Sequence, residues 1–291
     1  MIEGIIIKGI GGLYYVNTNK GVFECKARGL FRKEKIKPLV GDNVLIDVSD
    51  IDNTGYIMEI KKRETELIRP PVANVNQSII VFALKDPNPN LWLLDRFLLL
   101  SEKEKLNAVI VFNKTDLVSK EKLESIYDVY KNTGYKIINT STKSCSGIDG
   151  LKEVLKNKIS VFAGPSGVGK SSLLNSIEPN LELKIGDISD KTKRGKHTTR
   201  SSSLLELSFG GFVVDTPGFS SLDLSFIKED ELEGFFPEIY ENSMNCKFSD
   251  CKHNKEPGCN VKFELESGNI SKERYNNYLL FLEEIKKLRR Y

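Results

Sequence analysis

The sequence predicts three successive regions: a small all-β barrel, an α/β domain built on a mainly parallel sheet, and a C-terminal α-helical segment that binds a metal. Three observations predict this order. Five short β-like runs open the chain, strand-like and helical patterns then alternate, and three cysteines crowd beside a histidine near the end. We place the boundaries at residues 1–69, 70–224 and 225–291.

The composition fits a chain with more than one hydrophobic core. It has 291 residues, of which 40% are hydrophobic and 29% charged, and its formal net charge is +3. Because the charge is nearly balanced, any nucleic-acid surface must be local. No apolar run approaches the roughly 18 residues of a membrane span, and the first residues lack the features of a signal peptide. We therefore expect a cytoplasmic monomer without membrane contact.

The first region is typical of a closed β-barrel. Its turn-forming stretches, such as Gly11-Gly12 and Gly41-Asp42, separate the strand-like runs. Five strands in so short a segment, with no helical pattern between them, fit a barrel of the OB or SH3-like kind better than an open sheet with bare edges. Such barrels bind RNA in some proteins and are structural in others, and the sequence leaves both possibilities open. The five runs are residues 4–10, 13–18, 21–27, 43–48 and 55–60.

The second region follows Arg69-Pro70-Pro71, which we interpret as a linker. Repeated β-α-β units predict a mainly parallel sheet. Two later strand-like runs, 203–207 and 211–215, are close enough to form an antiparallel hairpin. Strands are expected at 79–84, 108–112, 136–139 and 159–163, and helices at 91–105, 120–131 and 150–156.

The last predicted element is an amphipathic helix that starts at Ser271 and ends in basic residues. A docking helix, whose terminal cations suit the helix dipole, is the first interpretation. Contact of its basic end with RNA phosphates is the alternative.

A phosphate-binding loop follows the strand at 159–163. The stretch Gly164-Pro-Ser-Gly-Val-Gly-Lys-Ser171 matches G-x-x-x-x-G-K-[ST] and precedes a helical pattern. Its glycines let successive backbone N–H groups turn toward phosphate oxygens, and the helix N-terminus adds partial positive charge. Lys170 is expected to reach the β and γ phosphates, and Ser171 to ligate Mg²⁺.

A second motif selects the base. Asn113-Lys-Thr-Asp116 ends the strand at 108–112, where open α/β sheets place ligand loops. Asp116 can accept two N–H groups from the guanine edge, Asn113 meets the other side, and the stem of Lys114 lies against the ring. Adenine lacks that donor pair, so we predict guanine. Ser141, Thr142 and Lys143 follow the strand at 136–139 and would supply backbone contacts to the base.

A third motif, Asp215-Thr-Pro-Gly218, ends the second strand of the predicted hairpin. Asp215 can hold Mg²⁺ through water, and the Gly218 N–H can bond the γ-phosphate. A basic stretch, residues 191–200, precedes the hairpin, and a threonine there could complete the Mg²⁺ shell. His197 in this stretch reads first as a solvated loop residue.

The order of these motifs predicts the topology of the domain. Ras-like GTPases place the phosphate loop before DxxG and NKxD, whereas here the base-binding motifs precede the phosphate loop and Asp215. We therefore predict a circularly permuted Ras-like α/β P-loop GTPase domain. The segment after Gly218, which senses the γ-phosphate, then leads directly into the C-terminal region.

The C-terminal region contains Cys246-x4-Cys251-x-His253-x5-Cys259. Three thiolates and one imidazole make a closed tetrahedral set for Zn²⁺, which suits a structural site rather than a catalytic one. Free cysteines on a loop are the alternative. Zinc can supply roughly 10 to 16 kcal/mol of apparent binding energy to a segment too small for its own core.

Together, the five-stranded barrel, the permuted motifs and the Cys-Cys-His-Cys segment resemble the ribosome small-subunit biogenesis GTPases, the RsgA or YjeQ family, over nearly the whole chain. The resemblance implies an OB-fold barrel, binding to the small ribosomal subunit and its rRNA, and a role in late subunit maturation. It also implies hydrolysis of GTP to GDP and phosphate, stimulated by the subunit.

The resemblance also assigns site residues. It places guanine recognition on Asn113, Lys114 and Asp116, zinc on the three cysteines and His253, and an Mg²⁺ ligand on Thr199. Phosphate and Mg²⁺ binding fall on Gly164, Pro165, Ser166, Gly167, Val168, Gly169, Lys170, Ser171 and Ser172.

The expected turnover is slow. Where Ras-like enzymes place a water-orienting glutamine after DxxG, this chain has Phe219, whose ring cannot orient a water by hydrogen bonding. A partner must then supply or arrange the missing group, with His197 as a candidate. Two other functions stay open: an RNA-binding zinc and barrel protein that holds nucleotide only structurally, and an ATP-dependent kinase.

Overall fold

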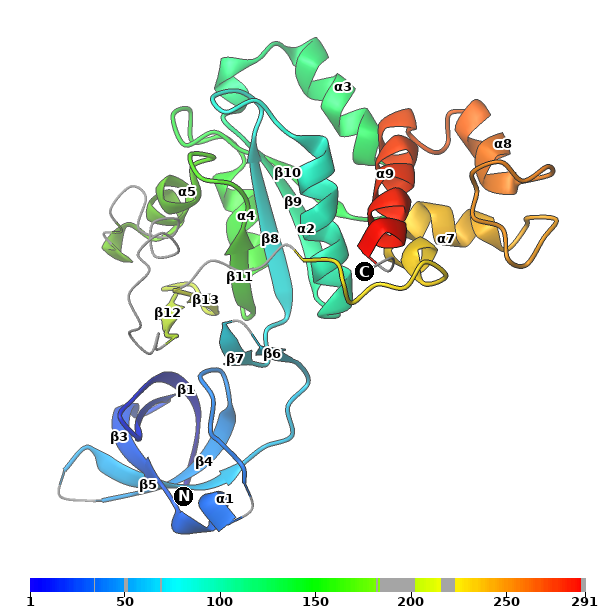
Figure 1. The fold of residues 1–291 in the computed structure, drawn as a ribbon. Coiled ribbons are helices and arrows are strands. Elements are labelled where there is room, and N and C mark those ends of the chain that lie inside the picture. Colours follow the sequence, from blue (N-terminus) through cyan, green and yellow to red (C-terminus); the bar gives the residue numbers. More distant parts are fainter. Residues whose placement is uncertain are drawn as a thin grey trace.

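The computed structural model describes residues 1–33, 35–49, 52–68, 70–181, 183, 202–215 and 223–288. A barrel lies at one end of the molecule and an α/β domain at the other, with the C-terminal helices packed beside the α/β domain (Figure 1). The barrel, the α/β domain and the C-terminal helices thus follow one another along the chain and occupy different parts of the molecule.

The N-terminal unit is a closed five-stranded barrel with the strand order β1-β2-β3-β5-β4. Neighbouring strands are antiparallel except β3 and β5, which are parallel. Alternate side chains such as Ile6, Val16 and Ile57 fill the interior and are fully buried, which confirms the predicted barrel. The strands are β1 (Ile2–Ile10), β2 (Leu13–Thr18), β3 (Gly21–Ala27), β4 (Asn43–Val48) and β5 (Thr54–Ile60).

One short helix, α1 (Gly29–Lys33), interrupts the barrel between β3 and β4. The sequence did not predict it, because five residues are too few to show a helical period.

The expected Pro-Pro linker is part of a small hairpin, formed by β6 (Glu66–Ile68) and β7 (Pro71–Ala73). This hairpin is fastened to the barrel: Val72 forms a bridge with Val40, and Asn74 Nδ2 donates to the Gly41 carbonyl at 2.9 Å. Gly41 has φ +90°, and a Cβ there would lie 2.1 Å from the Ala73 oxygen, so a side chain cannot fit. The connection between barrel and α/β domain is packed rather than extended.

The central domain contains a six-stranded sheet in the order β10-β9-β8-β11-β13-β12. All neighbouring pairs are parallel except β12 and β13, which form the predicted antiparallel hairpin at one edge. The strands are β8 (Gln77–Ala83), β9 (Asn107–Asn113), β10 (Lys136–Asn139), β11 (Ile159–Ala163), β12 (Leu204–Glu206) and β13 (Phe212–Val214).

Helices cover both faces of this sheet. On β8, Ile80 and Phe82 pack with α2 (Leu91–Lys103) and α3 (Lys120–Tyr130), whereas Ile79 and Val81 pack with α4 (Ile148–Leu155) and α5 (Lys170–Ile177). Successive strand residues point to opposite faces, and helices cover both faces, so every residue of β8 is buried. A 3₁₀ turn, η2 (Pro179–Leu181), follows α5.

The C-terminal unit packs on the α2 and α3 face of the sheet (Figure 1). A hydrophobic cluster joins it to Leu99 of α2. Among the described residues, no helix combines the length and apolar composition that crossing a membrane requires. The elements are η3 (Leu232–Phe235), α7 (Pro237–Ser243), α8 (Asn260–Glu266) and α9 (Lys272–Leu288).

A buried polar network fastens α9 to the central domain. Arg274 donates to both oxygens of Glu238, at 2.7 and 3.0 Å, and to Asp95 Oδ1 at 2.7 Å. Tyr130 and Asn277 donate to the two oxygens of Asp95, at 2.9 and 2.6 Å. All five side chains lie in the interior. Although burial lowers the pKa of Arg274, the facing carboxylates raise it well above its usual value, so the guanidinium stays charged.

An aromatic contact lies beside this network. Trp92 of α2 stacks on Phe281 of α9 with ring centroids 5.3 Å apart, and the Arg96 guanidinium lies over the Trp92 ring. Arg96 also donates to both carboxylate oxygens of Glu284 at 2.6 and 2.8 Å. Trp92 is the single tryptophan of the chain, so its fluorescence reports on the docking of α9.

We expect Arg274→Ala to detach or destabilise the C-terminal unit, because the change leaves two buried carboxylates without their cation. Removing one partner of a buried ion pair costs about 3–5 kcal/mol of unfolding free energy. Urea unfolding followed by Trp92 fluorescence measures the loss. The control is Lys120→Ala, which breaks an exposed pair with Glu124 and should cost at most about 1 kcal/mol. Equal losses for the two variants would contradict the importance of the buried network.

Candidate nucleotide and metal sites

The predicted phosphate loop joins the buried strand β11 to α5. Gly164 and Gly169 have φ values of +131° and +98°. A Cβ on Gly164 would lie 2.1 Å from the Val81 oxygen, and one on Gly169 would lie 2.5 Å from Asn113 Nδ2. Both positions therefore require glycine for their conformation and for close contact with neighbouring strand ends.

Lys170 is the first residue of α5, and its ammonium group folds back over the loop. Its Nζ donates to the carbonyls of Gly164 at 2.8 Å and Pro165 at 2.7 Å. Burial lowers the pKa of Lys170 to about 8, because a buried cation loses hydration. Ser171, next in the helix, is also buried. The remaining residues of the predicted set, Ser166, Gly167, Val168 and Ser172, lie in the same loop and first helical turn.

Asn113 connects the base motif to the phosphate loop. Asn113 is buried at the end of β9; its Nδ2 donates to the Val168 carbonyl at 2.8 Å and its Oδ1 accepts from Thr140 Oγ1 at 3.1 Å. Lys114 Nζ donates to the carbonyls of Gly167, at 2.8 Å, and Asp86. The two stretches, about 50 residues apart in the sequence, therefore form one site.

Asp116 and Ser141 meet in the loops that follow the neighbouring strands β9 and β10. Asp116 lies in the short helix η1 (Thr115–Leu117), and its Oδ1 accepts a hydrogen bond from Ser141 Oγ at 2.6 Å. The Asp116 side chain is exposed, whereas Ser141 is buried. Thr142 and Lys143 lie in the turn directly after Ser141, and the Ser144 amide donates to Ser141 Oγ at 3.2 Å. The carboxylate is thus held at one oxygen while it faces solvent.

Two residues of this site were missed from the sequence. Thr140, directly after β10, supports the base motif: its carbonyl accepts from the Thr115 amide at 3.2 Å, and its hydroxyl donates to Asn113 Oδ1. Its position, directly before Ser141 at a strand end, was the available signal. Asp86 contributes through its backbone carbonyl, which any residue could supply, so no sequence signal existed.

Asp215 directly follows β13, the parallel neighbour of β11. Ser203 Oγ donates to Asp215 Oδ2 at 3.1 Å, and the Asp215 amide donates to the Ser203 carbonyl at 2.9 Å. The other residues predicted near the γ-phosphate, His197, Thr199 and Gly218, lie outside the described residues.

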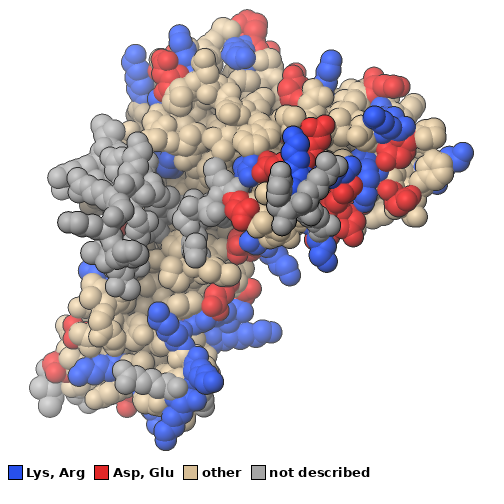
Figure 2. All heavy atoms as spheres, viewed as in Figure 1, with Lys and Arg blue, Asp and Glu red and all other residues tan. Residues whose placement is uncertain are grey.

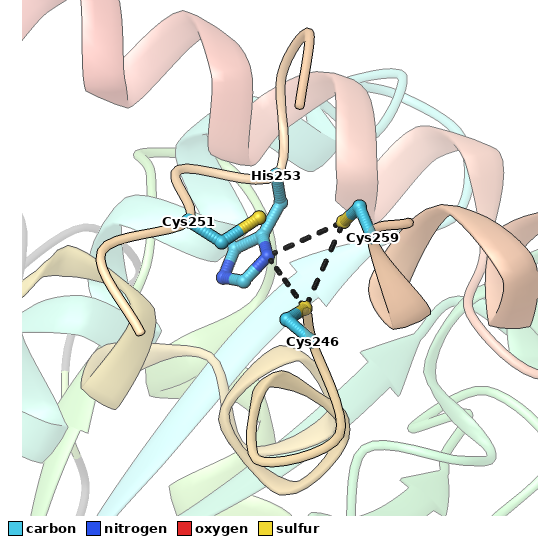
Figure 3. A group of neighbouring side chains, drawn as sticks. All are labelled: Cys246, Cys251, His253 and Cys259. Atoms are coloured by element: carbon cyan, nitrogen blue, oxygen red, sulfur yellow. Dashed lines mark hydrogen bonds between the residues drawn. The ribbon is translucent and has the colours of Figure 1, made fainter. Parts of the chain in front are cut away.

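The predicted metal ligands come together in the C-terminal unit. Figure 3 shows the sulfurs of Cys246 and Cys259 beside the ring of His253, with Cys251 on its other side. His253 Nδ1 lies 3.6 Å from Cys246 Sγ and 3.5 Å from Cys259 Sγ, and these sulfurs are 3.9 Å apart. The four ligand atoms all lie within 4.8 Å of one another. This arrangement forms a possible metal site.

Supporting contacts fix the orientation of His253. Its Nε2 lies 2.7 Å from Glu233 Oε2, so Nδ1 faces the sulfurs. Tyr275 donates to the His253 carbonyl at 2.6 Å. Glu233 lies 13 positions before the motif, and nothing in the spacing indicated it. A carboxylate on the second nitrogen of a histidine is a common support for metal binding.

Burial disfavours the deprotonated form of these cysteines when no cation is bound. It raises the pKa of Cys251 to about 12 and raises the pKa of Cys259, which disfavours the thiolates that bind metals. A bound cation reverses this effect, because its charge stabilises the deprotonated sulfur.

Comparisons with known proteins agree with this architecture. A family model described as RsgA GTPase matches residues 60–225, and one described as RsgA N-terminal domain matches residues 3–57. The small ribosomal subunit biogenesis GTPase RsgA of Alkaliphilus metalliredigens is 51% identical over 292 residues, with 100% of each chain covered.

Two solved structures are similar over almost their whole length. The structure of YloQ, described as a circularly permuted GTPase, has a TM-score of 0.83 at 42% identity and covers 99% of this chain and 96% of its own. YjeQ from Thermotoga maritima has a TM-score of 0.84 at 40% identity, with 98% of each chain covered. The chain therefore belongs to the RsgA family of GTPases, and its central domain is a circularly permuted GTPase domain.

Proposed function

We propose that this protein binds the small ribosomal subunit and its rRNA and assists late subunit maturation, hydrolysing GTP to GDP and phosphate with stimulation by the subunit. It acts as a cytoplasmic monomer, with units at residues 1–69, 70–224 and 225–291. The observation that carries the nucleotide part is the hydrogen bond from Asn113 to the Val168 carbonyl, which joins base loop and phosphate loop. The printed name of the A. metalliredigens relative supports the subunit as partner.

Guanine is the base that this site suits. Asp116 is exposed beside the bonded Ser141, and its carboxylate can accept the two N–H groups of the guanine edge. Asn113 Nδ2 uses one N–H on the phosphate loop, which leaves the second for the base. Lys114 is anchored at its tip, so its stem offers an apolar surface to the ring. The turn with Ser141, Thr142 and Lys143 closes the opposite side.

Magnesium fits the oxygen groups at the sheet edge. Ser171 supplies a hydroxyl at the start of α5, and Asp215 supplies a carboxylate at the end of β13, both of which are hard donors that Mg²⁺ prefers. When bound, the metal neutralises phosphate charge. Thr199 is the proposed third ligand. The backbone of Gly164–Ser172 and the Lys170 ammonium hold the phosphates, and the Gly218 amide bonds the γ-phosphate.

Slow hydrolysis in isolation follows from the residue after the Asp215 motif. Phe219 cannot donate to or accept from an attacking water. His197 is the candidate that the subunit brings to that water.

The barrel is the proposed contact with rRNA. Figure 2 shows lysine and arginine side chains gathered over the barrel on the face in view. A local basic surface suits a phosphate backbone even though the net charge of the chain is small. Exposed lysines in and after α1 and at the end of β5 are Lys33, Lys35, Lys37, Lys61 and Lys62.

Zinc is the proposed metal of the C-terminal unit. Tetrahedral zinc, with bonds of about 2.3 Å to sulfur and about 2.05 Å to nitrogen, separates two sulfurs by roughly 3.8 Å and sulfur from nitrogen by about 3.6 Å. The corresponding distances among Cys246, His253 and Cys259 are 3.9, 3.6 and 3.5 Å. These three distances support zinc as the ion, and Cys251 is the proposed fourth ligand.

We expect GTP turnover to be slow for the protein alone and to rise at least about tenfold when small subunits are added. Multiple-turnover phosphate release measures both rates. Large subunits serve as the matched control and should not stimulate.

Asp116→Ala should weaken GTP binding by about tenfold or more and remove the preference for GTP over ATP. Fast turnover without subunits, or a GTP preference that survives in Asp116→Ala, would contradict the proposal.

Nucleotide binding should take up protons near pH 8. The Lys170 pKa is lowered to about 8, so about half the lysine is neutral at that pH, and phosphate restores the proton. Calorimetry with GDP in buffers of different ionisation enthalpy should give an uptake of about half a proton at pH 8 and almost none at pH 7. Affinity should fall as pH rises above 8. Lys120→Met, which alters an exposed lysine outside the site, should keep the uptake. An equal uptake at both pH values would count against this role.

Cys251→Ser should lower the affinity for zinc by more than about a hundredfold, and Glu233→Gln by about 10- to 100-fold, because the first removes a ligand and the second its supporting carboxylate. Competition with a fluorescent chelator measures both. Cys145→Ser, which changes an exposed cysteine, is the control and should bind zinc normally. Unchanged zinc affinity in Cys251→Ser would rule out this ligand set.

A further inference from the structure

The β12–β13 hairpin lies between the barrel and the nucleotide site. Each of its strands has three residues, and β12 forms the edge of the six-stranded sheet. So short a hairpin is unstable alone, and an edge strand leaves backbone groups unpaired. The barrel supplies the missing cover: Lys8 of β1 forms an antiparallel bridge with Ser203, directly before β12.

A shared hydrophobic core strengthens this contact. Leu204 and Val214 of the hairpin belong to one cluster with barrel residues such as Ile6 and with Ile159 and Val161 of β11. Ile5 of the barrel and Phe212 of the hairpin both pack against this cluster and line the same crevice. The position of the hairpin is therefore set by the barrel as well as by the sheet.

Ser203 connects this contact to the nucleotide site. Its hydroxyl donates to Asp215 Oδ2 at 3.1 Å, and its carbonyl accepts from the Asp215 amide at 2.9 Å. The β11–β13 register, Ile159 with Phe212, places Asp215 level with Phe162. The phosphate loop starts two residues later, at the same edge. The residue that the barrel pairs with is thus the residue that orients this carboxylate.

We propose that Ser203 is a positioning residue for Asp215, through which the barrel influences Mg²⁺ binding at the nucleotide site. The hydrogen bond from the Ser203 hydroxyl to Oδ2 restrains the rotamer of the Asp215 carboxylate. The inference rests on the proposed function, since it takes Asp215 to hold Mg²⁺ through water. Because linkage is reciprocal, a ligand that displaces β1 changes Mg²⁺ affinity, and Mg²⁺ with nucleotide changes the barrel's affinity for its ligand.

The first test is the dependence of GDP affinity on Mg²⁺ for the full chain. In Ser203→Ala, the Mg²⁺ concentration that produces half of the gain in GDP affinity should rise about 3- to 10-fold, since a hydrogen bond to a charged group is lost. Affinity in EDTA should change less than about twofold. Ser203→Thr keeps the hydroxyl and should restore the normal value. Ser125→Ala, which removes an exposed hydroxyl bonded to the Lys122 carbonyl, is the matched control.

The second test starts from the barrel. Ile5→Ala removes a side chain that lies against the hairpin but touches no predicted nucleotide ligand, and it should shift the Mg²⁺ dependence in the same direction as Ser203→Ala. Ile36→Ala, an equal deletion in the groove beside α1, should not. The double variant Ile5→Ala/Ser203→Ala should shift less than the product of the single shifts, because both changes act on one contact.

The outcomes distinguish a failure of the proposed function from a failure of this inference. If the unaltered protein binds GDP equally well with Mg²⁺ and in EDTA, the role of Asp215 in the proposed function fails, and this inference fails with it. If Mg²⁺ matters but Ser203→Ala behaves like Ser125→Ala, only the inference is overturned. Independent effects of Ile5→Ala and Ser203→Ala would remove the barrel from the proposal.

Discussion

The buried hydrogen bond between Asn113 and the Val168 carbonyl is the contact on which the nucleotide site depends. It fixes the end of β9 to the loop that follows β11, across the intervening strand β8. An unpaired amide at this depth would cost about 1–3 kcal/mol, so the two loops are held at one distance. The pairing of Lys114 with the Gly167 carbonyl repeats the restraint. The base motif and the phosphate loop therefore form one unit although they are far apart in sequence.

Circular permutation decides what surrounds this site. The first strand of the domain along the chain is β8, in the middle of the sheet. The last described strand along the chain is β13, which lies two positions from β8 in the sheet. The barrel therefore lies beside the hairpin and covers its edge, while the C-terminal unit, described from residue 223, packs on the α2 and α3 face. There the Arg274 network fastens the C-terminal unit. The barrel thus contacts the sheet beside Asp215, whereas the C-terminal unit contacts helices α2 and α3 on one face of the sheet.

Much of the architecture could be predicted because its signals are local. Strand β11, its glycine-rich loop and α5 form one continuous stretch, and the period of the hydrophobic residues indicated most central strands and helices to within a few positions. The ligand spacing from Cys246 to Cys259 indicated a metal cluster directly. The signals failed where the elements are very short, as in α1 and the β6–β7 hairpin, because three to five residues carry no measurable period. The proline pair was misinterpreted for the same reason: Pro71 opens a strand.

The sequence by itself determined which chemical groups are present and which strand ends carry them, since backbone propensity, glycine conformation and hydrophobic period act over a few neighbouring residues. It also determined the permuted order of the motifs. Only the tertiary structure decided which partner each group meets: Asp95 with Arg274, Glu233 with His253, Ser203 with both Asp215 and the barrel. Those pairings depend on how sheets and helices pack. A hydrogen bond across many residues of intervening chain leaves no pattern in the chain itself.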